Sequence, residues 1–305
     1  MASTLVLARR SIQKYWQFYL LIIPVIAYFV IFQYVPMYGV QIAFREYNPV
    51  DGLTRSPFVG FMHFQRFFRS FQFRRVIVNT VGISLYQLGV AFPAPIILAI
   101  LLSELRSNKF RKTMQMLTYA PHFLSIVVVV GMLTTMLSPR TGILNHALMA
   151  LGFNSIFFMA EPHWFKTLFV FSALWQNGGW ASIIYIAAIA GIDPNLYEAA
   201  IVDGASTFKR IVHITIPSIM PTIVILLILQ CGQIMNVGFE RVFLMQNTIN
   251  MPASDVISTF VYRAGLLQAQ ISFASAVGLF NSVINCCLLV IVNQIARKKG
   301  ETSLF

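Results

Sequence analysis

Hydrophobic residues are gathered into six long runs, which short polar segments separate. Each run has about 20 residues or more, the length that an α-helix needs to cross the hydrocarbon core of a bilayer. Backbone groups in lipid must hydrogen-bond within their own segment, and the runs lack the alternation of barrel strands, so we expect helices. The predicted spans are Gln17–Val35, Val76–Ser103, Leu117–Ser138, Phe165–Gly191, Pro217–Gly238 and Ile271–Ile295.

The composition supports an all-α membrane protein with six transmembrane helices. Of the 305 residues, 57% are hydrophobic and only 10% are charged, whereas a soluble domain carries roughly 25% charged residues. The net charge of +12 is explained by cationic flanks that contact anionic lipid, so we expect no nucleic-acid partner. The cysteines lack the spacing of a metal site or a disulfide framework, and we interpret them as packing residues.

Six spans place both termini on one side of the membrane, and the distribution of lysine and arginine indicates which side. Twelve of these residues lie on the side of the termini and ten on the other, six of the ten in the first external segment. There "FVGFMHFQRFFRSFQFRR" interleaves Phe with Arg, a pattern typical of an interfacial helix. We therefore predict cytoplasmic tails at 1–15 and 298–305 and a six-helix domain at 16–297, with an external segment at 36–75 and a cytoplasmic loop at 192–216.

Several kinds of chemistry are missing from the chain. It has no G-x-x-x-x-G-K-[ST] motif for ATP phosphates and no H-E-x-x-H metal motif. Acidic residues are nearly absent from the predicted spans, although ion-coupled transporters usually need an intramembrane carboxylate or histidine relay. No internal repeat supports an inverted-repeat carrier. Energy for any transport should therefore come from another subunit.

The segment "LYEAAIVDGASTFKRIVHITIPSIMP" places charged and small residues between two predicted spans. Asp193 and Pro194 suit the N-cap and the first position of a helix. Gly204 permits a sharp bend before a second short helix. Small side chains would let a partner approach the backbone closely. The alternative is a loop helix that packs only on its own bundle.

The pattern E-A-A-x-x-x-G, followed ten residues later by I-x-[LI]-P, resembles the signature loop of binding-protein-dependent ABC importer permeases. It is formed here by Glu198-Ala199-Ala200, Gly204-Ala205, Ile214 and Pro217, with Ile216 in place of the usual leucine. Other stretches, among them "YVPMYGVQIAFREYNP", "VGFERVFLMQN" and "FASAVGLFNSVIN", are similar to maltose-type carbohydrate-uptake permeases. The nearest branch is the polysaccharide or lipoprotein type, which includes alginate importers. The resemblance covers nearly the whole chain.

The resemblance implies a type I ABC importer permease fold in the bacterial cytoplasmic (inner) membrane. It implies partners: two cytoplasmic ABC ATPase subunits, a second homologous permease, expected to be a different chain, and an extracytoplasmic solute-binding protein. The ATPase would bind ATP and Mg, so this chain would hold no cofactor and would not be an enzyme. The loop would couple the ATPase to the membrane helices through Glu198, Ala199, Ala200, Asp203, Gly204, Ala205, Phe208 and Pro217.

Polar and aromatic residues inside the predicted spans suggest a path for a sugar, since polar groups there are costly and usually functional. Amides can bind sugar hydroxyls, and aromatic rings can pack on sugar C–H faces. The resemblance adds that the fifth span contributes sugar contacts at this distance beyond the loop proline. Hydrogen bonding between helices is the alternative, and we favour it for Asn79, Gln87, Asn281 and Asn285. The candidates for the path are Gln230, Gln233, Asn236, Trp175, Asn177 and Trp180.

The predicted function is that of a permease subunit in an ATP-driven, binding-protein-dependent carbohydrate importer. Its cargo would be oligosaccharides or polysaccharide fragments, and the ATPase would drive alternating access through the loop. An acidic glycan such as alginate is one candidate. The arginines of the external segment could attract such a cargo or the binding protein, but we favour lipid contact. An ion-coupled or channel-type carrier without an ATPase, and a membrane scaffold, are the alternative functions.

Overall fold

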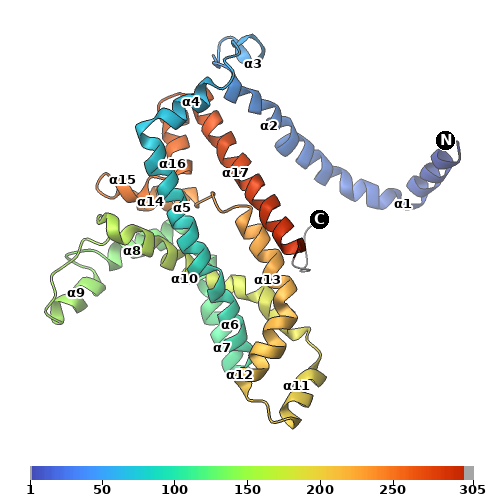
Figure 1. Ribbon diagram of the computed structural model, residues 1–305, viewed down its shortest axis with the longest axis vertical. Coiled ribbons are helices and arrows are strands. Elements are labelled where there is room, and N and C mark those ends of the chain that lie inside the picture. Colours follow the sequence, from blue (N-terminus) through green and yellow to red (C-terminus); the bar gives the residue numbers. More distant parts are fainter. Residues whose placement is uncertain (1, 299–305) are drawn as a thin grey trace.

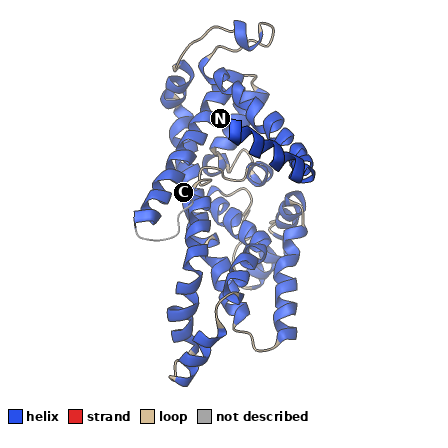
Figure 2. Ribbon diagram, turned by 90° about the vertical axis from the view of Figure 1, so that its right-hand side faces the viewer, coloured by secondary structure: helices blue, strands red, loops and turns tan. Residues whose placement is uncertain are grey.

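The computed structural model describes the backbone of residues 2–298 and the side chains of residues 14–298. Within this part of the chain the regular structure is helical (Figures 1 and 2), and Arg45 and Phe58 form one isolated bridge. The tail predicted at 298–305 lies outside the described residues except for Lys298, as does Met1 of the tail predicted at 1–15.

The elements alternate between long α-helices and short 3₁₀- or π-helical segments, which carry the label η. In chain order they are α1 (Ala2–Phe29), η1 (Val30–Tyr34), α2 (Val35–Met37), η2 (Tyr38–Phe44), α3 (Gly52–Arg55), α4 (Met62–Arg69), α5 (Phe71–Ala91), α6 (Pro93–Ser103), α7 (Asn108–Tyr119), η3 (Ala120–Phe123), α8 (Ile126–Met136), α9 (Ile143–Ala150), α10 (Pro162–Ala190), α11 (Pro194–Val202), α12 (Thr207–Arg210), η4 (Ile211–Thr215), α13 (Ile216–Cys231), α14 (Phe239–Met245), α15 (Met251–Ser254), α16 (Ile257–Tyr262), η5 (Arg263–Leu267) and α17 (Ile271–Lys298).

Four continuous helical stretches in the described chain are long and apolar enough to cross a membrane. A fifth span results if the bent pair Asn108–Phe123 and Ile126–Met136 is counted as one. Helix α10 has 29 residues, or about 43 Å, but its centre is the polar stretch "WQNGGW". The all-helical fold with several membrane-crossing helices is confirmed, while the number six stays a prediction. The four stretches are Lys14–Phe44, Phe71–Ser103, Thr207–Cys231 and Ile271–Lys298.

Two of the predicted spans are interrupted. The fifth was predicted to reach Gly238, but helix α13 ends at Cys231 and residues 232–238 form turns before α14. Gly232 begins this break, where glycine weakens a helix. The third predicted span bends by 99° between η3 and α8, after Pro121, which lacks the N–H that a continuing helix would need.

Helix α10 lies at the centre of the bundle and packs on α5, α6, α7 and α13, while α17 packs on η2, α4, α13 and α16. The N-terminal helix α1 runs away from this bundle (Figure 1), and none of the apolar window in Lys14–Phe44 is buried. The bundle therefore forms without α1, and the side chains of α1 that the structure describes, residues 14–29, are exposed.

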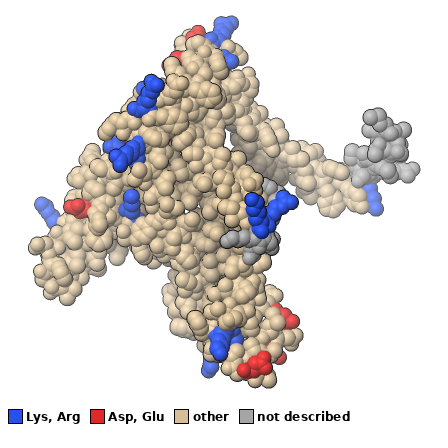
Figure 3. All heavy atoms as spheres, in the orientation of Figure 1, with Lys and Arg blue, Asp and Glu red and all other residues tan. Residues whose placement is uncertain are grey.

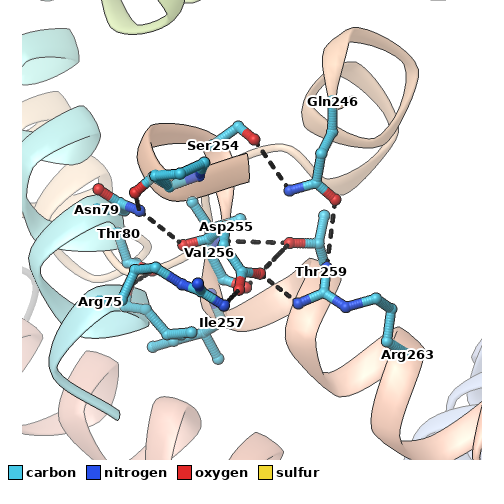
Figure 4. A network of polar contacts seen from close by, with 12 residues as sticks. Arg75, Asn79, Thr80, Gln246, Ser254, Asp255, Val256, Ile257, Thr259 and Arg263 are labelled. Atoms are coloured by element: carbon cyan, nitrogen blue, oxygen red, sulfur yellow. Dashed lines mark hydrogen bonds and ion pairs between the residues drawn. The ribbon is translucent and has the colours of Figure 1, made fainter. Parts of the chain in front are cut away.

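A buried ionic centre holds α5, α15, α16 and η5 together (Figure 4). Asp255 is fully buried. Its carboxylate accepts hydrogen bonds from Arg75 Nη2 at 2.8 Å and from Arg263 Nη2 at 2.5 Å. Asn79 Nδ2 donates to the Asp255 carbonyl at 3.2 Å. The three charges and the amide therefore fix one end of the bundle, far from α11 at the other end (Figure 1).

Candidate functional site

Helix α11 begins and ends with the local structure that its sequence predicts. The Asp193 side chain accepts a hydrogen bond from the Asn195 N–H at 3.0 Å, and Pro194 occupies the first position. At the other end Gly204 has a φ of +74°. The Ala205 N–H donates to the Ala200 carbonyl at 2.8 Å, which closes a Schellman motif. The predicted N-cap, bend and short helix pair are therefore confirmed.

The loop continues without interruption into the fifth span. Ser206 caps α12, with its Oγ 3.4 Å from the Lys209 N–H, and α12 leads through η4 into α13. The Tyr197 hydroxyl lies 2.9 Å from Thr215 Oγ1, which ties α11 to η4. Only three residues separate the end of α10 from the start of α11. A displacement of α11 can therefore reach both flanking helices.

The outer surface of the loop is apolar and uncovered. Val202 is 87% exposed and Phe208 74% exposed, and Glu198, Ala199 and Pro217 are also exposed, while Ala200 and Ala205 are half-buried. A Cβ atom at Gly204 would meet open space. The structure thus places seven of the eight predicted coupling residues on the α11–α12 loop, most of them exposed, and the eighth, Pro217, in the first turn of α13.

Charge is unevenly distributed at this end of the molecule. Acidic side chains gather over α11 and basic ones over the neighbouring α7 and α12 (Figure 3). Asp193, Glu198 and Asp203 make no ion pair with the side chains of residues 14–298. The loop therefore presents uncompensated negative charge beside exposed apolar and small side chains.

Polar side chains line a cavity of about 390 Å³ between α5, α6, α10 and α13. Its lining includes Gln87, Asn177, Gln230 and Gln233. A smaller cavity of about 70 Å³ shares the three glutamines and adds Asn236. None of these three glutamine side chains forms a hydrogen bond with another described residue. Three free amides therefore converge on one cavity, although Gln87 was interpreted as a packing residue.

Two other residues predicted on the path are already bonded within the chain. Asn236 Oδ1 accepts hydrogen bonds from Asn281 Nδ2 at 2.8 Å and from Asn285 Nδ2 at 3.2 Å. Trp180 stacks on the His122 ring at a centroid distance of 4.6 Å and an interplanar angle of 6°. These side chains hold helices together near the cavity, and the lone His122 gave no sign of this stacking in the sequence.

Asn177 connects the two groups, whereas Trp175 lies apart from them. Asn177 lines the polar cavity, and its Oδ1 lies 3.1 Å from His122 Nδ1. Trp175 instead lines a larger apolar cavity of about 610 Å³ between α8, α9 and α10. Two residues of helix separate side chains by about 200° around its axis, which explains why these near neighbours face opposite ways.

These features define a class of protein. Helices long enough to cross a membrane surround a cavity lined by amides, and a charged, uncovered loop joins two of them at one end. That combination is typical of a transport protein that works with a further subunit. Comparison with known proteins identifies the family.

Residues 91–300 match the family described as binding-protein-dependent transport system inner membrane component. The protein LplB of Bacillus subtilis (strain 168) is 42% identical over 94% of this chain and 90% of its own length. The polygalacturonan/rhamnogalacturonan transport system permease protein YteP of the same strain is 41% identical, over 96% of this chain and 91% of its own. The chain therefore belongs to this family of inner-membrane transport components.

Solved structures agree. One match is a chain in the crystal structure of a bacterial ABC transporter involved in the import of the acidic polysaccharide alginate. The TM-score is 0.89 and the sequence identity 40%, and the match covers 95% of this chain and 98% of that one. A second crystal structure, of a bacterial alginate ABC transporter in complex with alginate pentasaccharide-bound periplasmic protein, gives the same score and identity over 97% and 99% of the two chains.

The predicted family and the type I ABC permease fold are confirmed by these matches. The predicted role as an importer permease is confirmed as well. The chain is a transport subunit, and a separate subunit hydrolyses ATP. The roles of individual residues in the loop and the cavity stay predictions.

Proposed function

We propose that this chain forms half of the membrane pathway of an ATP-driven carbohydrate importer and that its α11–α12 loop docks on a separate ATPase subunit. One observation carries the coupling role. The Gly204 turn holds Val202 and Phe208 outward on a loop with open negative charge, and no other part of the described chain covers them. A surface of small and apolar residues at a membrane protein's edge suits a protein partner.

The cavity is the proposed route for the cargo. Gln87, Gln230 and Gln233 offer amide donors and acceptors that no other described residue uses, and sugar hydroxyls need such groups. Asn177 borders the same cavity. YteP and the matched structures are named for polygalacturonan, rhamnogalacturonan and alginate. We therefore assign an acidic oligosaccharide as the cargo.

The remaining assembly follows from the same proposal. The free apolar surface of residues 14–38 would pack against a second, homologous permease, which we expect to be a different chain. The loop and both termini lie on the cytoplasmic side of six spans, and a binding protein delivers cargo to the opposite side. ATP and Mg are bound by two ATPase subunits.

A matched pair of glycine variants tests the coupling role. Gly204 and Gly152 both have positive φ, and a Cβ at either would meet open space. Both close Schellman motifs, on α11 and on α9. Leucine in this conformation costs about 1–2 kcal/mol at either position. Gly204→Leu should reduce co-purification of the ATPase by about ten-fold or more, because the loop surface is disturbed, whereas Gly152→Leu should leave it unchanged.

The experiment uses the complete complex in nanodiscs, with ATPase hydrolysis and uptake of oligogalacturonate or oligoalginate as readouts. Equal loss of the ATPase subunit in both variants would show that the loop has no special role. Uptake that continues without nucleotide would favour the ion-coupled or channel-type alternative.

A further inference from the structure

A buried arginine binds the middle of α10, one of the two spans that flank the α11–α12 loop. Arg241 of α14 is almost fully buried. Its Nη1 donates to Ser172 Oγ at 3.1 Å, and its Nη2 donates to Gln176 Oε1. Ser172 and Gln176 lie one turn apart on α10. The guanidinium therefore fastens α14 to the middle of α10.

Gln176 extends this contact to a third helix. Its Nε2 donates to the Leu124 carbonyl at 2.6 Å. Leu124 is one of the two residues between η3 and α8, where the chain bends by 99°. A bend frees backbone groups that must find other partners in lipid. The side chain of Gln176 thus satisfies a carbonyl of the bend with one end and binds Arg241 with the other.

The contact closes a ring of helices that includes the coupling loop. From α11 the chain runs back into α10, and forward through α12 and η4 into α13. Helix α13 ends at Cys231, and α14 follows after the break at 232–238. The two arms pack on each other, and α14, beyond the break, is joined to α10 again where Arg241 binds Gln176. Between Gln176 and the loop α10 is continuous, whereas the other arm is interrupted at 232–238 before it reaches Arg241.

The positive charge of Arg241 is stabilised by an unusual set of hydrogen-bond partners. The neighbouring Glu240 acts on it electrostatically, but no acidic side chain in the described chain forms an ion pair with it, and its hydrogen-bond acceptors are neutral oxygens. An ionised group buried in a membrane protein without a directly bound carboxylate is costly and commonly functional. Neutral acceptors hold a guanidinium less strongly than carboxylates do, so this contact can open more easily than the one between Asp255 and its two arginines.

From this geometry we infer that Arg241 and Gln176 are positioning residues for transport. Together they form a latch that fastens α14 to α10 in one state of the cycle and opens in another, so that movement of the loop is converted into rearrangement around the cavity. The inference rests on the proposed role of the loop and adds the element through which its two arms are coupled.

Two substitutions should shift the latch in opposite directions. Gln176→Glu gives up the hydrogen bond to the Leu124 carbonyl, because a carboxylate has no N–H, but it places a full negative charge against the guanidinium. It should therefore hold the latch closed, so that uptake and binding-protein-stimulated ATP hydrolysis both fall by about ten-fold or more. Arg241→Gln removes the charge and should loosen the latch. Hydrolysis should then continue while uptake falls, raising the ATP consumed per cargo by about five-fold or more. Arg241→Lys should restore part of the coupling.

The measurements use the complete complex in proteoliposomes with the loaded binding protein. A merely structural role would lower hydrolysis and uptake in the same proportion in both variants and leave ATP per cargo constant, which would overturn the inference. A wild-type complex in which the binding protein does not stimulate hydrolysis would instead contradict the proposed function itself.

A distance measurement provides a readout that does not depend on activity. Spin labels replace Phe243 on α14 and Phe171 on α10, both exposed, after the three native cysteines have been changed to serine. The distance should differ between the nucleotide-free and ATP-trapped complexes, and Gln176→Glu should hold it at the nucleotide-free value. An identical distance in both states of the wild-type complex would exclude a latch.

Discussion

The ionic centre around Asp255 and the α11–α12 loop use charge in opposite ways. Asp255 is fully buried, and arginines of its own chain bind both of its carboxylate oxygens (Figure 4). In the loop Glu198 and Asp203 are exposed, and neither forms an ion pair among the described residues. Charge that the chain neutralises internally stabilises its own fold, whereas charge that it leaves open is available to a partner.

The amides in the middle of the molecule show the same contrast. Asn236 is hydrogen-bonded to Asn281 and Asn285, while the Gln230 and Gln233 side chains line a cavity and have no hydrogen-bond partner among the described residues. The polar groups of one helix bundle thus divide into those that hold the bundle and those that face a ligand. Substitutions in the first group should change stability, and substitutions in the second should change binding.

The largest effect on stability is expected at Asp255. Asp255→Asn would leave Arg75 and Arg263 facing a neutral amide, and breaking a buried ion pair costs about 3–5 kcal/mol. Thermal unfolding of the detergent-solubilised complex should show a marked fall in its midpoint. Asp203→Asn in the loop is the control, and it should change stability by no more than about 0.5 kcal/mol. Equal midpoints for the two variants would remove the contrast between the regions.

Exposed phenylalanines allow the opposite test. Phe208 in the loop is 74% exposed, and Phe58 in the external segment is 71% exposed, so neither should matter much to stability. Phe208→Ala should weaken ATPase binding by about 2–4 kcal/mol if this side chain fills a pocket on the partner. Phe58→Ala should leave that binding unchanged. Titration of purified ATPase onto the permease in nanodiscs measures both, and similar affinities would place the docking surface elsewhere.

Local chemistry made parts of the fold and of the loop predictable. Asp193 and Pro194 mark a helix start, and Gly204 marks its end, because each acts within one turn of its own position. Apolar runs likewise indicated the long helices. The break after Cys231 was missed because the run stays apolar up to that point and the turns depend on contacts with α17, such as the 3.0 Å hydrogen bond from the Met235 N–H to Asn285 Oδ1.

Long-range partners were not predictable from a single sequence. Arg75 reaches Asp255 across 180 positions, and Arg241 reaches Gln176 across 65. Gln87 and Asn236 both line the smaller cavity, yet Gln87 has no hydrogen-bond partner among the described residues, whereas Asn236 is bonded to Asn281 and Asn285. The packing of the helices decides which of two similar residues keeps its amide free of partners. Residue type alone does not predict this.

A pair of amide substitutions tests the division within the cavity. Gln233→Leu should weaken cargo binding by about 1–3 kcal/mol, because a sugar hydroxyl would lose its partner in a desolvated site, and should leave thermal stability unchanged. Asn236→Leu should lower stability, because Asn281 and Asn285 lose their acceptor. The cargo concentration that gives half-maximal ATPase stimulation measures the first effect. If Gln233→Leu only destabilised the complex, its amide would serve packing as well.

The smallest effect is expected where the loop touches its own bundle. Tyr197→Phe removes the hydrogen bond to Thr215 Oγ1, which contributes about 0.5–1.5 kcal/mol. Because this bond ties α11 to η4 and not to the core, the unfolding midpoint should stay the same while amide hydrogen exchange in α11 becomes faster by up to about ten-fold. Thr215→Val should have the same effect, and the double variant should add nothing further. Additive effects would mean that the two hydroxyls act separately. The position of α11 would then depend on the apolar contacts of η4 alone.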